Sequence, residues 1–474
     1  MSVITGRSGQ TVLMLIGFLG LVLMSLSLVV WHLDPLLVLL LLLGNVGLAV
    51  LSIRPYYGVQ AFIMLLFFEN ALPERQGITL MKALGVIIIT SWLVNMALRR
   101  EGKFHFEPLT IVMGLFLGWC SMSLFYAVDS SISSSALFTF AQLVLAALMF
   151  STVVDTPARM RGVYWAFVLW AGVSTLIAIV MYYAGMTRVA VGLLGNRNLL
   201  AGYINVAIVS AYLLLLSTPH RLSKLLLGAL LPIFFLGVAL TLSRSVLIVL
   251  PITLLFVWYR VAKQRSFLVF LGSILTISVI TVVLPESFWK RAESIAPAIQ
   301  HQGDTFGTRV RLWKIALRMV EDRPLTGVGA ANFVAAYPRY AHGEMETLLY
   351  VTHNAYVAIA AEMGLVGLTL FLMLNFMSLR AAGRAVRFGK GAGLPDLEML
   401  GVITEVCLIS IMLGGLSGNS EGSKCLWMLF GLSLGLAHLV RRASAANSPI
   451  DVQPGYAAQR KGELAEWTKA PIGP

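Results

Sequence analysis

The sequence predicts an all-α, polytopic integral membrane protein with about 12–14 transmembrane helices and one helical periplasmic loop. Of its 474 residues, 58% are hydrophobic and 12% are charged, whereas about one-quarter of the residues in an ordinary soluble domain are charged. The apolar residues form repeated runs of roughly 17–25, a length that crosses about 30 Å of hydrocarbon. Residues 286–352 form the only long hydrophilic stretch, so the sequence offers no separate soluble domain.

Each apolar run bounded by polar residues is a predicted span. The run at 56–68 is short, and the runs at 225–242 and 245–259 are almost continuous, so the number of spans could be as low as twelve. The fourteen runs lie near residues 11–31, 35–53, 56–68, 78–98, 108–127, 132–154, 162–184, 199–217, 225–242, 245–259, 266–285, 353–379, 398–417 and 426–440.

The short loops sort by charge when the N-terminus is placed inside. Alternate loops carry most of the basic residues, and this asymmetry predicts that they are cytoplasmic. The basic loops hold Arg54, Arg99, Arg100, Lys103, Arg159, Arg161, Arg221, Lys224, Arg260, Lys263, Arg265, Arg380, Arg384, Arg387 and Lys390, against Arg75, Arg188, Arg197, Arg244 and Lys424 in the others. The net charge of +13 therefore reflects topology and contact with membrane lipids, and no nucleic-acid motif accompanies it.

This pattern sets the predicted organisation and location. Residues 1–442, including the loop 286–352, form a transmembrane domain of an inner-membrane protein, and residues 443–474 form a mobile cytoplasmic tail. Both termini are expected in the cytoplasm and the long loop outside it. Cys120, Cys407 and Cys425 lie in or beside apolar segments and show no disulfide or metal-ligand spacing.

The long loop contains a predicted amphipathic helix that starts near Thr308 and ends by Pro324. Its apolar face is expected to hold Val310, Trp313, Leu317 and Val320, and its basic face Arg311, Lys314 and Arg318. One interpretation is a helix on the membrane surface with its basic side toward headgroups. The other is a lid over a cavity that holds a diphosphate or a phosphorylated acceptor. The two are compatible.

Two arginines lie where a helix meets a loop. Arg197 follows Asn196, and Arg244 lies between Ser243 and Ser245 in a tight turn. An arginine near hydrocarbon either extends to the headgroups or faces a polar cavity, where its planar donors suit a phosphate group. We favour the polar cavity for both arginines.

His353 lies where the long loop re-enters the membrane, between Thr352 and Asn354. A neutral imidazole can accept a proton near pH 7. A lone histidine is more often structural than catalytic, so its position alone favours the structural role.

Six motifs now give a resemblance to a known family. In order they are GNRNLLAGY at 195–203, LSRS at 242–245, RVRLW at 309–313, PLTGVGAANF at 324–333, HNAY at 353–356 and EMGLVGL at 362–368. Together they resemble the O-antigen ligase family over residues 190–370, and the many-span layout extends the likeness over most of the chain. Arg197 stands where many relatives have proline.

The resemblance implies a lipid-sugar glycosyltransferase-type (GT-C-like) fold and an enzyme of the bacterial envelope. Such a ligase takes O-antigen from an undecaprenyl-diphosphate donor and transfers it to the lipid A-core acceptor in the periplasm. The resemblance implies that Arg244, with Arg309 or Arg311 and with Arg197 as a further candidate, binds the diphosphate. It also implies that His353 receives the proton of the acceptor hydroxyl, giving inversion.

Three further expectations complete the prediction. Glu344 and Glu346 could orient His353 or replace it as the base. No cofactor is expected, and the lack of an Asp-x-Asp triplet predicts a metal-independent reaction. A polymerase of the same superfamily is the nearest alternative, and a transporter of lipid-linked glycan is the alternative from another class, although the charged candidates gather at one face rather than at mid-membrane.

Overall fold

The computed structural model describes residues 54–68, 80–99, 107–261, 305–341 and 351–447. Every regular element in these ranges is helical, which confirms the all-α prediction. The predicted spans at 11–31, 35–53 and 266–285, the candidate residues Glu344 and Glu346, and the tail beyond Asn447 lie outside the described residues.

The chain divides into two compact units, residues 1–105 and 106–474, which are described separately. In the first unit, α3 (Pro55–Leu66) packs against α4 (Leu80–Arg99). Pro55 opens α3, where a missing backbone N–H does no harm.

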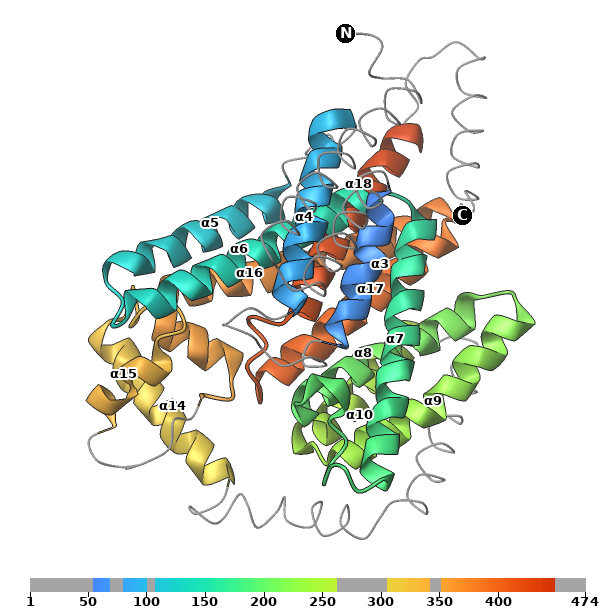
Figure 1. Cartoon of the computed structure of the whole chain (residues 1–474). Helices are drawn as coiled ribbons and strands as arrows, with labels where there is room; N and C mark the ends of the chain where they lie inside the picture. The colour runs from blue at the N-terminus through green and yellow to red at the C-terminus, as the bar shows by residue number, and fades with distance from the viewer. Residues whose placement is uncertain (1–53, 69–79, 100–106, 262–304, 342–350, 448–474) are drawn as a thin grey trace, which may run out of the picture. The chain divides into compact units, whose positions relative to one another are not determined.

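The second unit contains all the other described helices (Figure 1). They are α5 (Pro108–Met122), η2 (Ser123–Phe125), α6 (Ser130–Val153), α7 (Pro157–Tyr183), η3 (Gly192–Leu194), α8 (Arg197–Ser217), α9 (Arg221–Thr241), α10 (Arg244–Val261), α14 (Thr305–Asp322), α15 (Phe333–Tyr340), α16 (Ala355–Ala392), α17 (Pro395–Gly415) and α18 (Lys424–Asn447). The first residues assigned to the tail by sequence, 443–447, are the last turn of α18.

Nine helices in the described ranges are long and apolar enough to cross a membrane. They coincide with the nine runs predicted between residues 108 and 261 and between 353 and 440, so the polytopic prediction is confirmed there. The helices of the short run at 56–68 and the run at 78–98 are also apolar, with shorter described stretches at Pro55–Leu66 and Gly85–Ala97.

Small residues let these helices pack closely. A Cβ atom on Gly431 of α18 would lie 2.4 Å from the Ala147 carbonyl oxygen of α6, and one on Gly401 of α17 would lie 2.9 Å from Val386 of α16. Small residues at helix contacts are typical of membrane proteins, where backbones must approach without a hydrophobic driving force. The aromatic side chains of Phe116 and Trp427 fill the space between α5 and α18.

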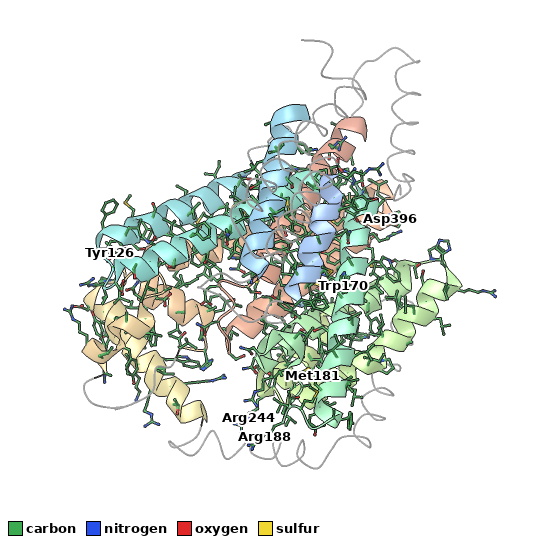
Figure 2. All side chains as sticks on the ribbon, viewed as in Figure 1. Tyr126, Trp170, Met181, Arg188, Arg244 and Asp396 are labelled. Atoms are coloured by element: carbon green, nitrogen blue, oxygen red, sulfur yellow. The ribbon has the colours of Figure 1, made fainter. Side chains whose placement is uncertain are left out.

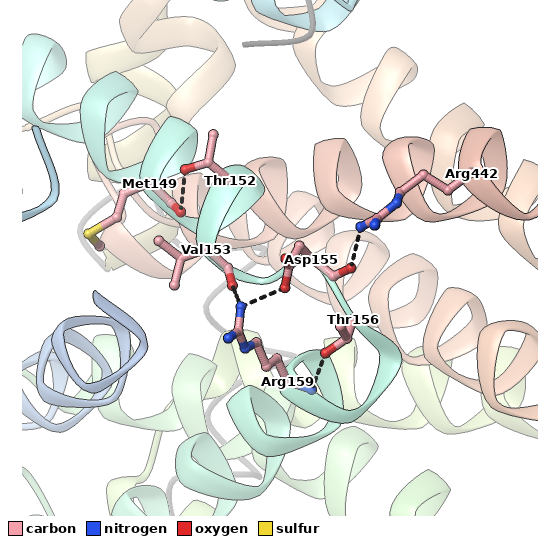
Figure 3. Close-up of polar contacts among 7 residues, drawn as sticks. All are labelled: Met149, Thr152, Val153, Asp155, Thr156, Arg159 and Arg442. Carbon is pink, nitrogen blue, oxygen red and sulfur yellow. Dashed lines mark hydrogen bonds and ion pairs between the residues drawn. The ribbon is translucent and has the colours of Figure 1, made fainter. Parts of the chain in front are cut away.

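Contacts between loops in the second unit form two sets. One set surrounds Asp155, whose carboxylate binds Arg159 at 2.7 Å and whose carbonyl oxygen accepts from Arg442 at 3.5 Å (Figure 3). Thr156 caps α7 beside them by accepting from the Arg159 backbone N–H at 3.2 Å. Arg161 also binds Asp396 here, so helix ends predicted to be cytoplasmic meet one another. We call this the Asp155 end.

The second set joins the loops predicted to lie outside. The Val128 N–H donates to the Val328 carbonyl oxygen at 3.1 Å, and the Ala190 N–H donates to the Leu240 carbonyl oxygen at 2.9 Å. The Ala355 N–H donates to the Gly418 carbonyl oxygen at 3.0 Å. We call this the Asn354 end, after the residue that caps α16. The two sets agree with the predicted alternation of the chain across the membrane.

The loop helix differs from its prediction in two respects. It begins at Thr305 rather than near Thr308, and Leu317, on the predicted apolar face, is 56% exposed. The side packed against α15 and α16 instead holds Leu312, Ile315, Ala316 and Met319, all fully buried. Val310, Trp313 and Val320 are partly buried. The side of the helix that is buried in the protein is therefore a different one from the side that carries Leu317.

Candidate functional site

The turns that carry Arg197 and Arg244 are joined to each other at the Asn354 end. The Ser243 hydroxyl donates to Asn198 Oδ1 at 2.9 Å, which connects the start of α10 with the start of α8. Asn196 caps α8 by accepting from the backbone N–H groups of Asn198 and Leu199 at 2.9 and 3.2 Å. Arg197 and Arg244 are therefore the first residues of two adjacent helices.

The turn before Arg244 has an unusual backbone. Leu242 ends α9 with φ 51°, a left-handed conformation that a branched side chain rarely adopts. The Thr241 hydroxyl accepts from the Ser243 N–H at 3.3 Å and stabilises the turn. Such strain persists where the surrounding structure holds it, and functional sites are common places for it.

Arg309 of α14 lies close to both of these arginines. Burial, and then the positive charges of Arg244 and Arg197, lower the pKa of Arg309. Its Nε atom is buried and has no hydrogen-bond partner among the described residues. We call Arg197, Arg244 and Arg309 the cationic cluster. Positive charges crowded in a partly buried place favour the binding of an anion.

His353 lies beside this cluster. Burial, and then the charge of Arg309, lower the pKa of His353, so its imidazole is neutral near pH 7. Its φ is 50°, and the residues on either side are held in place. The Trp313 indole N–H donates to the Thr352 carbonyl oxygen at 2.9 Å, and Asn354 caps α16 by accepting from the Tyr356 and Val357 N–H groups.

Helix N-termini add to the positive potential of this region. The helices α8 and α10 begin at the cluster residues Arg197 and Arg244, and α16 begins directly after His353 and Asn354. Each helix start carries about half a positive charge and exposes backbone N–H groups, which suits phosphate. Figure 2 shows Arg244 at the start of α10, on the side of this helix group that faces α14.

The position of one predicted site residue, Arg311, stays a prediction. Residues of an α-helix are about 100° apart, so Arg311 leaves α14 about 200° round from Arg309. In the described ranges, no three His, Cys, Asp or Glu side chains gather in a way that could hold a metal ion.

One ionisable residue to which the sequence analysis gave no role, Glu362, holds two segments of the chain together. Glu362 of α16 accepts hydrogen bonds from the backbone N–H groups of Ala331 and Phe333 at 3.1 and 3.2 Å. The signal was present, because both 324–333 and 362–368 are motifs rich in glycine, which often marks close backbone approach. Their contact with each other could not be read from one sequence.

The fold and this region define a class of protein: a multi-pass, α-helical membrane protein with a cationic cluster and a neutral histidine at one end of its helices. Residues 227–372 match a family model described as O-Antigen ligase. The match confirms the resemblance to the O-antigen ligase family, whose members are membrane glycosyltransferase-type enzymes, either ligases or polymerases. It includes Arg244, Arg309 and His353, whereas Arg197 precedes it. None of the curated proteins compared with the chain matches it.

Proposed function

We propose that this protein is an O-antigen ligase that moves glycan from undecaprenyl diphosphate to the lipid A-core at the periplasmic face of the inner membrane. The observation that carries the proposal is the proximity of the cationic cluster to His353. A diphosphate leaving group and an acceptor hydroxyl need these two kinds of side chain close together. The Asn354 end faces the periplasm in this proposal, because the basic loops belong to the Asp155 end.

In the proposed reaction the acceptor hydroxyl oxygen attacks the anomeric carbon of the donor. The new glycosidic bond forms as the bond from that carbon to the diphosphate oxygen breaks, and the configuration inverts. The hydroxyl proton passes to His353, and the electron pair stays on the lipid diphosphate. The cationic cluster stabilises the charge that develops there, and Arg311 is a further candidate for this role.

The lowered pKa of His353 fits its proposed role. A base must be unprotonated before it can accept a proton, and Arg309 favours the neutral imidazole. Once the diphosphate has bound, its negative charge offsets that of Arg309, so His353 becomes a stronger base when the donor is in place. Glu344 and Glu346 remain candidates for orienting His353 or for acting as the base.

The test is reconstitution of the purified protein in lipid nanodiscs with a lipid-linked glycan donor. Lipid A-core and lipid-linked repeat units are offered as separate acceptors, and the products are separated by mass. We expect glycan on lipid A-core, and we expect His353→Ala and Arg244→Ala to abolish its formation. Arg159→Gln, which lies at the Asp155 end, is the matched control and should retain activity.

Two results would replace this proposal with another. Extension of the lipid-linked repeat unit without transfer to lipid A-core would make the protein a polymerase. Movement of the donor between leaflets of sealed vesicles, with no new glycosidic bond in either assay, would make it a transporter.

A further inference from the structure

Helix α16 is broken at Gly364, about one turn further along the chain than Ala361. Gly364 has φ 68° and ψ −173°, which no helical residue adopts. A Cβ atom there would lie 2.2 Å from the Leu325 carbonyl oxygen, so glycine is required by both conformation and space. A break inside an apolar helix leaves backbone groups that need other partners.

The segment 324–333, which follows α14, supplies those partners. The N–H groups of Val328 and Gly329 donate to the carbonyl oxygens of Ala361 and Glu362 at 3.0 and 2.8 Å, and the Leu365 N–H donates to Pro324 at 2.8 Å. The two hydrogen bonds of the Glu362 carboxylate complete the set. The segment is thus bound to the break in α16 through both backbone and side chain.

A second connection lies nearer the other end of α14. There Trp313 binds the carbonyl oxygen of Thr352, the residue before His353. Between the two connections, Leu312, Ile315 and Met319 of α14 share a buried cluster with Phe333 and Ala361. Figure 1 shows α14 and α15 beside the first part of α16. Arg309 and His353 are therefore joined in one assembly, through α14 and the start of α16.

Arg197 and Arg244 belong to a different assembly, because Ser243 and Asn198 join α10 to α8. These helices pack against each other and against α17, which also packs against α16, whereas α14 packs against α15 and α16. The proposed diphosphate site is thus formed by two assemblies, and the position of α14 on α16 decides where Arg309 lies.

We propose that Glu362 is a positioning residue for the transfer reaction, one that sets Arg309 relative to His353 by fixing the segment 324–333 to the break in α16. The inference rests on the proposed function for its readout. It adds a residue that touches neither donor nor acceptor. Glutamine at this position keeps the size of the side chain but presents only one acceptor oxygen to the two N–H groups.

The test compares Glu362→Gln with Glu321→Gln, a matched change at an exposed position of α14. We expect Glu362→Gln to lower kcat/KM on the order of tenfold to a hundredfold, the effect of a misplacement of about 1 Å. Glu321→Gln should have wild-type activity. Because Arg309 lowers the pKa of His353, displacement of Arg309 should also move the acid limb of the pH–rate profile to higher pH.

Double variants separate positioning from a general loss of structure. With Arg309→Met the effect of Glu362→Gln should largely vanish, since both changes remove the same guanidinium from the site. With Arg159→Gln, at the Asp155 end and away from the proposed site, it should persist in full. If Glu362→Gln fails to fold, Glu362→Asp tests the same claim, because it keeps both acceptor oxygens but draws them back from the two N–H groups, and it should show the same dependence on Arg309.

The outcomes distinguish the two proposals. If Glu362→Gln lowers kcat/KM by the same factor in the Arg309→Met background as in the Arg159→Gln background, and the acid limb does not move, Glu362 has no positioning role while the proposed transfer still holds. If Arg309→Met and His353→Ala both retain normal transfer, the proposed function itself fails.

Discussion

Replacement of Arg309 with methionine removes a positive charge that the folded protein holds at a disadvantage. Burial and the charges of Arg244 and Arg197 lower the pKa of Arg309, which means that folding disfavours its charged form. The guanidinium stays charged over the ordinary pH range, so this destabilisation is present at every working pH. Methionine keeps an apolar stem of similar shape. We therefore expect Arg309→Met to raise the melting temperature of the ligand-free protein.

The same change should weaken binding of a lipid diphosphate. A hydrogen bond to a charged group contributes about 1.5–3 kcal/mol, which corresponds to roughly a tenfold to a hundredfold increase in Kd. The assay measures the melting temperature and the Kd for undecaprenyl diphosphate on one nanodisc preparation. A gain in stability with a loss of affinity is the signature of a residue that serves binding rather than folding.

The matched control is Arg318→Met on the same helix. Arg318 donates to the Tyr340 carbonyl oxygen at 3.0 Å, so its loss should lower the melting temperature and leave the diphosphate Kd unchanged. A lower melting temperature for Arg309→Met together with an unchanged Kd would refute the reasoning about the cationic cluster.

Three further predictions follow from the same structure. In Arg309→Met, the acid limb of the kcat/KM profile should move to higher pH, because the charge that lowers the pKa of His353 is gone. An acid limb that does not move would show that Arg309 does not influence the ionisation of His353. Transfer should continue in excess chelator, and activity that is lost there and restored by a divalent ion would overturn the metal-independent mechanism. Burial raises the pKa of Glu421 from 4.5 to about 7, so its ionisation opposes folding as the pH rises through that interval. The melting temperature of Glu421→Gln should therefore rise relative to that of the wild type as the pH increases from about 4.5 to 7. A difference in melting temperature that does not change with pH would contradict this explanation.

The membrane spans could be predicted because hydropathy is a local property. Each of the nine described spans contains a long stretch of high hydropathy with few charged residues, and prolines at the starts of α5, α7 and α17 mark boundaries that sequence alone shows. The loop helix was harder. Its apolar residues occur on more than one side, and contact with α15 and α16 decides that Leu312 is buried while Leu317 is exposed.

The candidate site could be predicted only in part. Arg244 and His353 could be singled out, because an arginine in a turn between two spans and a histidine at a loop end are unusual. Their relation through Arg309 depends on how α14 packs on α16. The role of Glu362 could not be found in advance, since its partners, Ala331 and Phe333, are backbone groups of a segment with no charged residue.

Donor binding and glycan transfer measured together in His353→Ala test the central claim most directly. If His353 receives the acceptor proton beside a diphosphate held by the cationic cluster, the variant should bind undecaprenyl diphosphate with wild-type affinity and form no product. Near-normal transfer to lipid A-core by the same folded variant would contradict the account.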